Sequence, residues 1–232
     1  MREKLKESLK EPKKFAEGVG FYKLVWIFVI FSVFGTYYEQ IIVLLQNVWG
    51  GNGFYWEPRQ GVLYGPLSPI YGVGAVLMVV ALKGFREFKP WQTFLISAGI
   101  GGAFELVASF IQEIFTGTRS WYYYDHWLNL DGRTSVLAMA IWGLLGIILI
   151  YLLYPLISRL VERLPVKAGK IITWVIVVVV GLDILVSYTA LIRQDLRRDG
   201  YAPVTFVGEF CDKYYTDEYL HKKIPNMTRL NS

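Results

Sequence analysis

The chain has 232 residues, of which 54% are hydrophobic, and its formal net charge is +5. Soluble domains are about 45–50% apolar, and the excess here lies in long apolar runs, which is typical of integral membrane proteins. The single cysteine, Cys211, excludes an intrachain disulfide and a cysteine-cluster metal site, and no P-loop motif for an ATPase is present. We therefore expect no metal and no cofactor. We also expect no nucleic-acid partner, because the basic residues do not interleave with aromatic residues on a soluble module.

The predicted elements begin with a lysine-rich cytoplasmic leader, residues 1–20, which is either a short amphipathic surface helix or disordered. A spanning helix needs roughly 20 apolar residues. The runs that follow therefore predict an all-α, polytopic membrane helix bundle with about five transmembrane helices. The predicted spans cover residues 21–46, 64–82, 91–115, 134–156 and 169–192. The transmembrane helical domain would thus extend over residues 21–192, and a polar C-terminal tail would follow over residues 193–232.

Lysine and arginine residues set the predicted orientation, because they are enriched in cytoplasmic loops. They are concentrated in the leader and in the loops at 83–90 and 157–170, and are sparse in the alternate loops. The N-terminus is therefore expected on the cytoplasmic side of the cell membrane, and the tail outside. The tail opposes this assignment, because it opens with Arg193, Arg197 and Arg198. Either the three basic segments outweigh it, which we favour, or a segment assigned as a loop enters the membrane.

Aromatic residues recur through the tail, which is polar but not of low complexity. They predict a short helix that packs on the membrane domain or lies at its surface. The residues are Phe206, Phe210, Tyr214, Tyr215 and Tyr219.

Three carboxylates lie inside the predicted spans, where an uncompensated charge is costly. They are Glu39, Glu105 and Asp183. Helical spacing places small and polar residues beside both glutamates, among them Gly35 and Gly101. Such faces pack against other helices rather than lipid, which predicts that both glutamates point into the bundle. Each carboxylate is either functional or a packing group, and packing is favoured for Asp183.

The second span has an irregular, Pro/Gly-rich start, with Pro66, Pro69 and two glycines in residues 64–72. Irregular backbone at membrane depth must lie within protein. Its free N–H groups could hold an anion or orient a substrate, with Tyr64 and Tyr71 beside it. The alternative is an ordinary helix start with a kink.

A predicted outer loop, residues 121–133, is dense in hydrogen-bonding groups, including Asp125 and Asn129. Trp121 and its aromatic neighbours either line a site or form an interfacial aromatic belt. Arg133, at the start of the fourth span, is the expected cationic partner of the buried glutamates, the alternative being an arginine that extends to the interface.

These features converge on the outer half of the predicted bundle and define one candidate polar or substrate-binding cluster. Its members are Glu39, Tyr64, Pro66, Pro69, Tyr71, Glu105, Trp121, Asp125, Asn129 and Arg133.

Several motifs occur in order along most of the chain, beginning with Glu39. They continue with GVLYGPLSPIYG at residues 61–72, then Glu105, WYYYD at 121–125, LDGR at 130–133 and DEYLHKKIPNM at 217–227. This pattern resembles the bacterial, poorly characterised family of ABC-transporter permeases of the CmpB type. The resemblance implies a role in transport.

Three functions remain open on this sequence. The favoured one is a permease-like transport component, acting as a homodimer or with a separate ATPase subunit in the lipid bilayer. The second is an intramembrane enzyme acting on a lipid or lipid-linked head group, with Glu39 and Glu105 as acid and base and Arg133 binding phosphate. No nucleophile–base pair is recognisable, so catalytic residues are not assigned and a non-enzyme is favoured. The third is a non-catalytic membrane scaffold or sensor.

Overall fold

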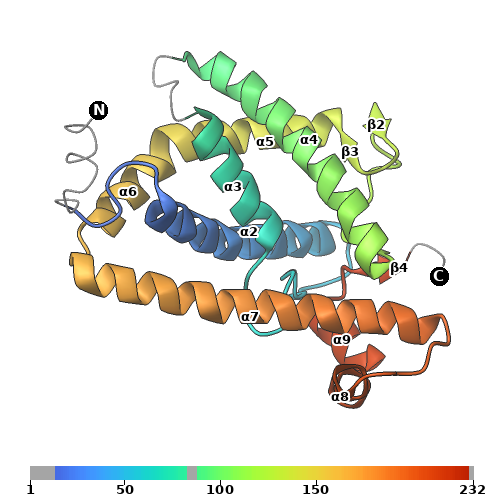
Figure 1. The fold of residues 1–232 in the computed structure, drawn as a ribbon. Helices are drawn as coiled ribbons and strands as arrows, with labels where there is room; N and C mark the ends of the chain where they lie inside the picture. The colour runs from blue at the N-terminus through green and yellow to red at the C-terminus, as the bar shows by residue number, and fades with distance from the viewer. Residues whose placement is uncertain (1–13, 83–87, 230–232) are drawn as a thin grey trace.

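The computed structural model describes residues 14–82 and 88–229, and the regular secondary structure of this part of the chain is almost entirely helical (Figure 1). Its helices are α2 (Phe21–Trp49), α3 (Pro69–Leu82), α4 (Pro90–Thr116), α5 (Val136–Ile148), α6 (Tyr154–Glu162), α7 (Val166–Arg198), α8 (Phe206–Tyr214) and α9 (Asp217–Lys223). A π-helical turn over Leu149–Leu153 joins α5 to α6. Two short antiparallel pairs join β1 (Thr118–Arg119) to β4 (Thr228–Arg229) and β2 (Asn129–Leu130) to β3 (Thr134–Ser135). The predicted all-α membrane bundle is confirmed, whereas most of the predicted leader, residues 1–13, lies outside the described residues.

Within the described chain, four helical stretches are long and apolar enough to cross a membrane: α2, α4, the continuous α5–α6 rod and α7. The helix α3 is also apolar but has only 14 residues, or about 21 Å at 1.5 Å per residue. The hydrocarbon core of a bilayer is roughly 30 Å thick, so α3 alone is short for a crossing. The irregular start predicted for the span over 64–82 is confirmed. Residues 61–68 are irregular, and the helix begins only at Pro69.

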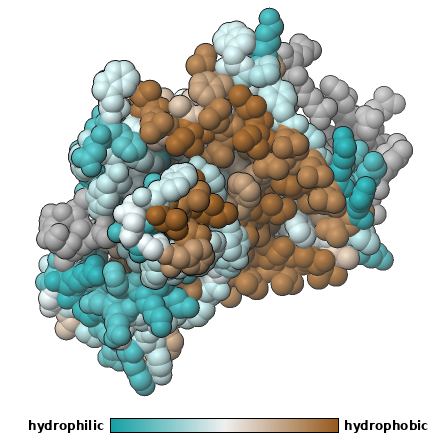
Figure 2. Space-filling model, turned by 180° about the vertical axis from the view of Figure 1, so that it is seen from behind, coloured by the Kyte–Doolittle hydropathy of each residue, from teal (hydrophilic) through white to brown (hydrophobic). Residues whose placement is uncertain are grey.

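The surface between the two ends of the molecule is apolar. Figure 2 shows a broad hydrophobic area bounded by hydrophilic groups at the lower left and at the right. On α7, Trp174, Val178 and Leu185 are all more than half exposed. Exposed apolar side chains over such an area suit contact with lipid tails rather than water.

Contacts between distant segments define the two ends of the bundle. At one end, the fully buried Lys23 near the start of α2 forms an ion pair of 2.7 Å with Glu162 at the end of α6. At the other end, β1 follows α4 and pairs with β4 of the tail. There the Asp195 side chain of α7 also lies directly against Gly117. The beginning of α2 and the end of α6 therefore share one end of the bundle, and the ends of α4 and α7 share the other.

Glycines allow neighbouring helices, α2 with α3 and α4 with α5, to approach closely. A Cβ atom added to Gly35 of α2 would lie 2.2 Å from Cγ of Tyr71 on α3. One added to Gly101 of α4 would lie 2.3 Å from Cβ of Trp142 on α5. Small residues at these positions therefore let the helix backbones pack tightly. The predicted small-residue faces are confirmed at these two positions.

The irregular segment 61–68 is held in place by polar side chains of α7. The backbone N–H of Tyr64 donates to Oδ1 of Asp183 at 3.2 Å, and that of Leu63 donates to Oγ of Ser187 at 2.8 Å. Backbone donors away from water need such partners, since an unpaired group costs free energy. Asp183 therefore has the packing role that the sequence favoured.

The tail forms two short helices that pack on the end of α7 through paired charges. Arg193 is buried and donates to both carboxylate oxygens of Asp212, at 2.9 and 2.7 Å. Arg197 donates to Asp212 at 2.8 Å and to Asp217 at 2.7 Å, and Arg198 lies 3.8 Å from Asp217. The arginines that opposed the predicted orientation are thus neutralised by carboxylates of the tail itself.

Candidate functional site

A cavity of about 360 Å³ lies between α2, α3, α4, α5 and the loop after β1. This volume is within the range of small-molecule sites, roughly 300–1,000 Å³. Its walls combine carboxylates, an arginine and aromatic rings, and we call it the polar cavity. The lining residues used below are Tyr38, Glu39, Arg59, Tyr71, Glu105, Ser120, Trp121, Tyr123, His126, Trp142 and Leu145.

Glu105 forms the buried acidic wall of the polar cavity and is only 5% exposed. Its two carboxylate oxygens accept hydrogen bonds from the Tyr123 and Thr134 hydroxyls, each at 2.8 Å. Burial and then the charge of Glu105 raise the pKa of Tyr123 well above its ordinary value, so this phenol remains a donor. Among the described residues, Glu105 has no ion-pair partner.

Glu39 forms the second acidic group and lies beside the Tyr71 hydroxyl. Its carboxylate is 3.7 Å from Nε of Arg59. Arg59 also donates to Glu57 at 3.2 Å. About a quarter of each side chain of the Glu39–Arg59 pair is exposed. The pair is therefore loose, and its members are accessible to a ligand.

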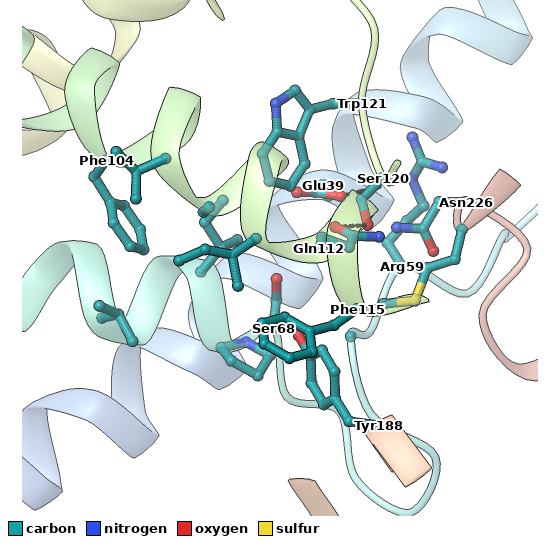
Figure 3. Close-up of a pocket in the computed structure, with 18 of the residues that line it drawn as sticks. Glu39, Arg59, Ser68, Phe104, Gln112, Phe115, Ser120, Trp121, Tyr188 and Asn226 are labelled. Atoms are coloured by element: carbon teal, nitrogen blue, oxygen red, sulfur yellow. Dashed lines mark hydrogen bonds and ion pairs between the residues drawn. The ribbon is translucent and has the colours of Figure 1, made fainter. Parts of the chain in front are cut away.

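A second cavity, of about 400 Å³, lies between α3, α4, α7 and the end of the tail. We call it the amphipathic cavity. Figure 3 shows most of its polar side chains, among them Gln112, Ser120 and Asn226, gathered around Glu39, whereas Ser68, Phe104 and Tyr188 lie away from that group. At the polar end, Ser120 donates to Gln112 at 2.9 Å.

The two cavities share a wall. Glu39, Arg59, Ile70, Ser120 and Trp121 line both. The loose ion pair thus stands between a space lined by both polar and aromatic groups and a mainly apolar one.

Arg133 is placed differently from the sequence expectation. It is buried and forms ion pairs with Glu113 and with Asp131, the latter at 2.8 Å. The expected pairing of Arg133 with Glu39 or Glu105 is therefore wrong. The reason is local: Glu113 lies two helical turns beyond Glu105, near the end of α4, and this is the carboxylate that Arg133 contacts.

The other predicted residues divide into two groups. Pro69 and Tyr71 each line one of the cavities, and Trp121 lines both. The rest lie outside the lining. Tyr64 and Pro66 are exposed on the irregular segment, and Asp125 is exposed in the loop. The Asn129 amide bonds to backbone atoms of the loop itself, accepting from Gly132 at 2.9 Å.

Sequence reasoning missed several lining residues, above all Arg59, Ser120, Tyr123 and Trp142. Arg59 was visible as the single basic residue of the predicted loop over residues 47–63, and Tyr123 as part of the aromatic run. Trp142 had no polar neighbour in sequence to mark it, and it reaches the cavity only because Gly101 lets α5 approach α4.

Comparisons with known proteins bear on this arrangement. No curated protein and no solved structure matches the chain. A family model described as "Putative ABC-transporter type IV", ABC_trans_CmpB, matches residues 26–188. The matched range includes Glu39, Arg59, Glu105 and the strands β1, β2 and β3. Since this match covers more than two thirds of the sequence, the chain belongs to that ABC-transporter family of the CmpB type.

Proposed function

We propose that the chain is a permease-like component of a membrane transporter, and that its substrate occupies the polar cavity. The observation that carries the proposal is the wall shared by the two cavities, at the Glu39–Arg59 pair. Ionisable groups inside a membrane bundle commonly mark substrate pathways. In this bundle they line spaces large enough for a small molecule.

The geometry of the Glu39–Arg59 pair allows its two charged groups to move apart when a substrate passes. At 3.7 Å the two groups attract one another without a tight, fully buried contact. Such partly exposed pairs contribute only about 0–1 kcal/mol. Their separation therefore costs little, and a substrate that contacts either group can replace the lost interaction.

An energy source would come from another chain. The sequence contains no P-loop motif, whereas the family is described as an ABC transporter. We therefore propose a separate ATPase subunit, with a second copy of this chain as the alternative partner for completing the pathway.

The proposed orientation places the N-terminus in the cytoplasm and the two cavities toward the outer side. It is supported by the basic loops of the sequence and by the tail, where Asp212 and Asp217 neutralise the three arginines that would otherwise favour the cytoplasm.

Cysteine accessibility tests both the orientation and the pathway. In a Cys211→Ala background the chain has no other cysteine, so single cysteines can be introduced at chosen sites. Glu209→Cys on α8 and Lys167→Cys at the start of α7 are exposed controls for the two ends. Ser120→Cys reports on the shared wall.

A membrane-impermeant maleimide should label Glu209→Cys only in intact spheroplasts and Lys167→Cys only in inside-out vesicles. Ser120→Cys should be labelled from outside in the resting state, and from inside when the co-purified ATPase is supplied with ATP. If Ser120→Cys reacts from one side under every condition, the shared wall is not a passage. The lipid-enzyme or sensor interpretation then gains support.

Affinity purification from the native membrane tests the partner. A stoichiometric P-loop ATPase is expected to remain bound after gentle extraction. Purification of the chain alone, with transport retained in vesicles, would contradict the need for that subunit.

A further inference from the structure

The walls of the polar cavity carry a row of aromatic rings that the proposed function does not explain by itself. The Tyr38 and Tyr71 ring centroids are 6.0 Å apart, and Tyr71 stacks on Trp142 at 5.7 Å. Tyr123 and His126 form a second ring pair at 5.1 Å in the loop. All five rings line the same cavity. The face of an aromatic ring carries negative electrostatic potential and attracts cations.

The charges of the cavity point in the same direction. The guanidinium of Arg59 faces two carboxylates, Glu39 of the cavity lining at 3.7 Å and Glu57 outside the lining at 3.2 Å. Among the described residues, the hydrogen-bond partners of Glu105 are all neutral: the hydroxyls of Tyr123 and Thr134 and the indole of Trp142. Within residues 14–82 and 88–229, no lysine, arginine or histidine forms an ion pair with it. The cavity therefore has an excess of acidic groups.

A buried carboxylate without a cationic partner needs one to be stable in its charged form. We propose that the polar cavity binds an organic cation, a quaternary ammonium or alkylated amine, beside the Glu105 carboxylate and against the aromatic rings of the wall, among them Tyr38 and Tyr71. This inference rests on the proposed function and names its substrate class.

The chemistry of the walls selects this class over others. Inorganic divalent cations prefer six or more oxygen ligands, and no group of three acidic or metal-ligating side chains occurs among the described residues. An anion would meet the excess of carboxylates. An alkylated ammonium instead combines one positive charge with apolar methyl groups, which match a carboxylate surrounded by aromatic rings.

The test is isothermal titration of the full chain in nanodiscs of neutral lipid. The probe is choline chloride, and 3,3-dimethyl-1-butanol serves as its uncharged analogue of the same shape. Choline should bind, and the neutral analogue should bind at least about tenfold more weakly, because it lacks the charge that Glu105 and the rings attract.

Three variants assign the binding to the cavity. Glu105→Gln should weaken choline binding at least about tenfold. Tyr71→Leu removes the ring but keeps a Cγ atom against Gly35, so it offers a second variant if Glu105→Gln does not fold. Glu209→Gln removes an exposed carboxylate of α8 and should leave the affinity unchanged.

Equal binding of choline and its neutral analogue, or an affinity unchanged by both cavity variants, would overturn the proposal. Failure of choline and tetramethylammonium to bind would overturn it as well. The accessibility of Ser120→Cys is independent of these outcomes. Two-sided labelling without cation binding rejects only the substrate class, whereas one-sided labelling with cation binding rejects only the transport role.

Discussion

Two charged clusters lie at the same end of the bundle but differ in how completely their charges are satisfied. Arg133 is almost fully buried and is paired with both Glu113 and Asp131. Glu39 and Arg59 are partly exposed, are 3.7 Å apart and stand beside two cavities. The first arrangement leaves little for a ligand to improve and suits a structural role. The second leaves interactions open, which is what a binding site requires.

The largest expected effect comes from the satisfied cluster. Arg133→Gln would leave the carboxylates of Glu113 and Asp131 short of a cation and would empty a buried position over the Phe110 ring, whose centroid lies 3.7 Å from Cζ of Arg133. Removal of one member of a buried charge pair typically costs about 3–5 kcal/mol. We expect a loss near the lower value, because Glu113 and Asp131 are partly exposed and keep Arg119 nearby. The free energy of unfolding in mixed micelles, followed by circular dichroism, measures it.

Arg133→Lys provides the matched control for this change. It keeps the charge but cannot reproduce the forked contacts of a guanidinium, so an intermediate loss is expected. A loss below about 1 kcal/mol for Arg133→Gln, the value typical of an exposed pair, would remove the distinction between the two clusters.

The next effect concerns the packing that positions the open site. In Gly35→Ala, the new Cβ atom would lie 2.2 Å from Cγ of Tyr71, so α3 or the Tyr71 ring must move. Overpacking of this kind costs about 1–3 kcal/mol. We also expect weaker ligand binding in the polar cavity, because Tyr71 lies on its wall beside Glu39. Thermal unfolding and choline titration of the same preparation measure both effects.

Gly99→Ala on α4 is the control, because a Cβ atom at Gly99 would meet nothing within 4 Å. This variant should be neutral or more stable by about 0.5–1 kcal/mol, since alanine favours a helix over glycine. Equal behaviour of the two variants would show that close approach at Gly35 does not position the cavity wall.

The sequence predicted the class of fold and the inward position of Glu105 because both follow from periodic, local patterns. Long apolar runs indicate helices, and the small residues beside Glu105 indicate a packed face. The partner of Glu39 could not be found this way. Arg59 lies in the loop between α2 and α3 and Arg133 in the loop before α5, and only the path of these two loops decides which of them reaches Glu39. The tail was also ambiguous, because its arginines and its aspartates are separated along the chain and meet only when α8 folds back on α7.

The tail provides a third charge cluster, and Cys211 reports on it. This thiol is 3% exposed and adjoins Asp212, which pairs with Arg193. Arg193→Gln should release α8 and raise the maleimide reaction rate of Cys211 at least about tenfold, since burial otherwise blocks the thiol. Burial raises the pKa of Cys211, as does Asp212, whereas Arg193 lowers it. Loss of Arg193 would therefore slow the intrinsic reaction, so any acceleration reports exposure. An unchanged rate would show that the pair does not hold the tail.

Acid should release the same contact. Hydrogen bonds from Arg193, together with those from Arg197, hold the pKa of Asp212 below its ordinary value. A depressed carboxyl pKa stabilises the docked tail above the unfolded-state pKa, about 4. That contribution is lost as the pH falls through the lower pKa of the folded state. The reaction of Cys211 with a pyridyl disulfide, which proceeds in acid, should therefore show a buried thiol from pH 5 to 7 and an exposed one only below about pH 4. Exposure already at pH 6 would contradict control by Asp212.

The smallest effect on stability, and the one that decides the comparison, is expected at the open site. Glu39→Gln, Arg59→Gln and the double variant should each unfold within about 1 kcal/mol of the unchanged chain, with a coupling of similar size, because a loose, partly exposed pair contributes no more. Their effect should appear in accessibility: with the pair removed, Ser120→Cys should react from both sides without ATP. A double-mutant cycle on unfolding and on labelling measures the two properties in parallel. Strong coupling in stability with unchanged labelling would make Glu39–Arg59 a structural pair like Arg133–Glu113, and the site would have to be sought elsewhere in the bundle.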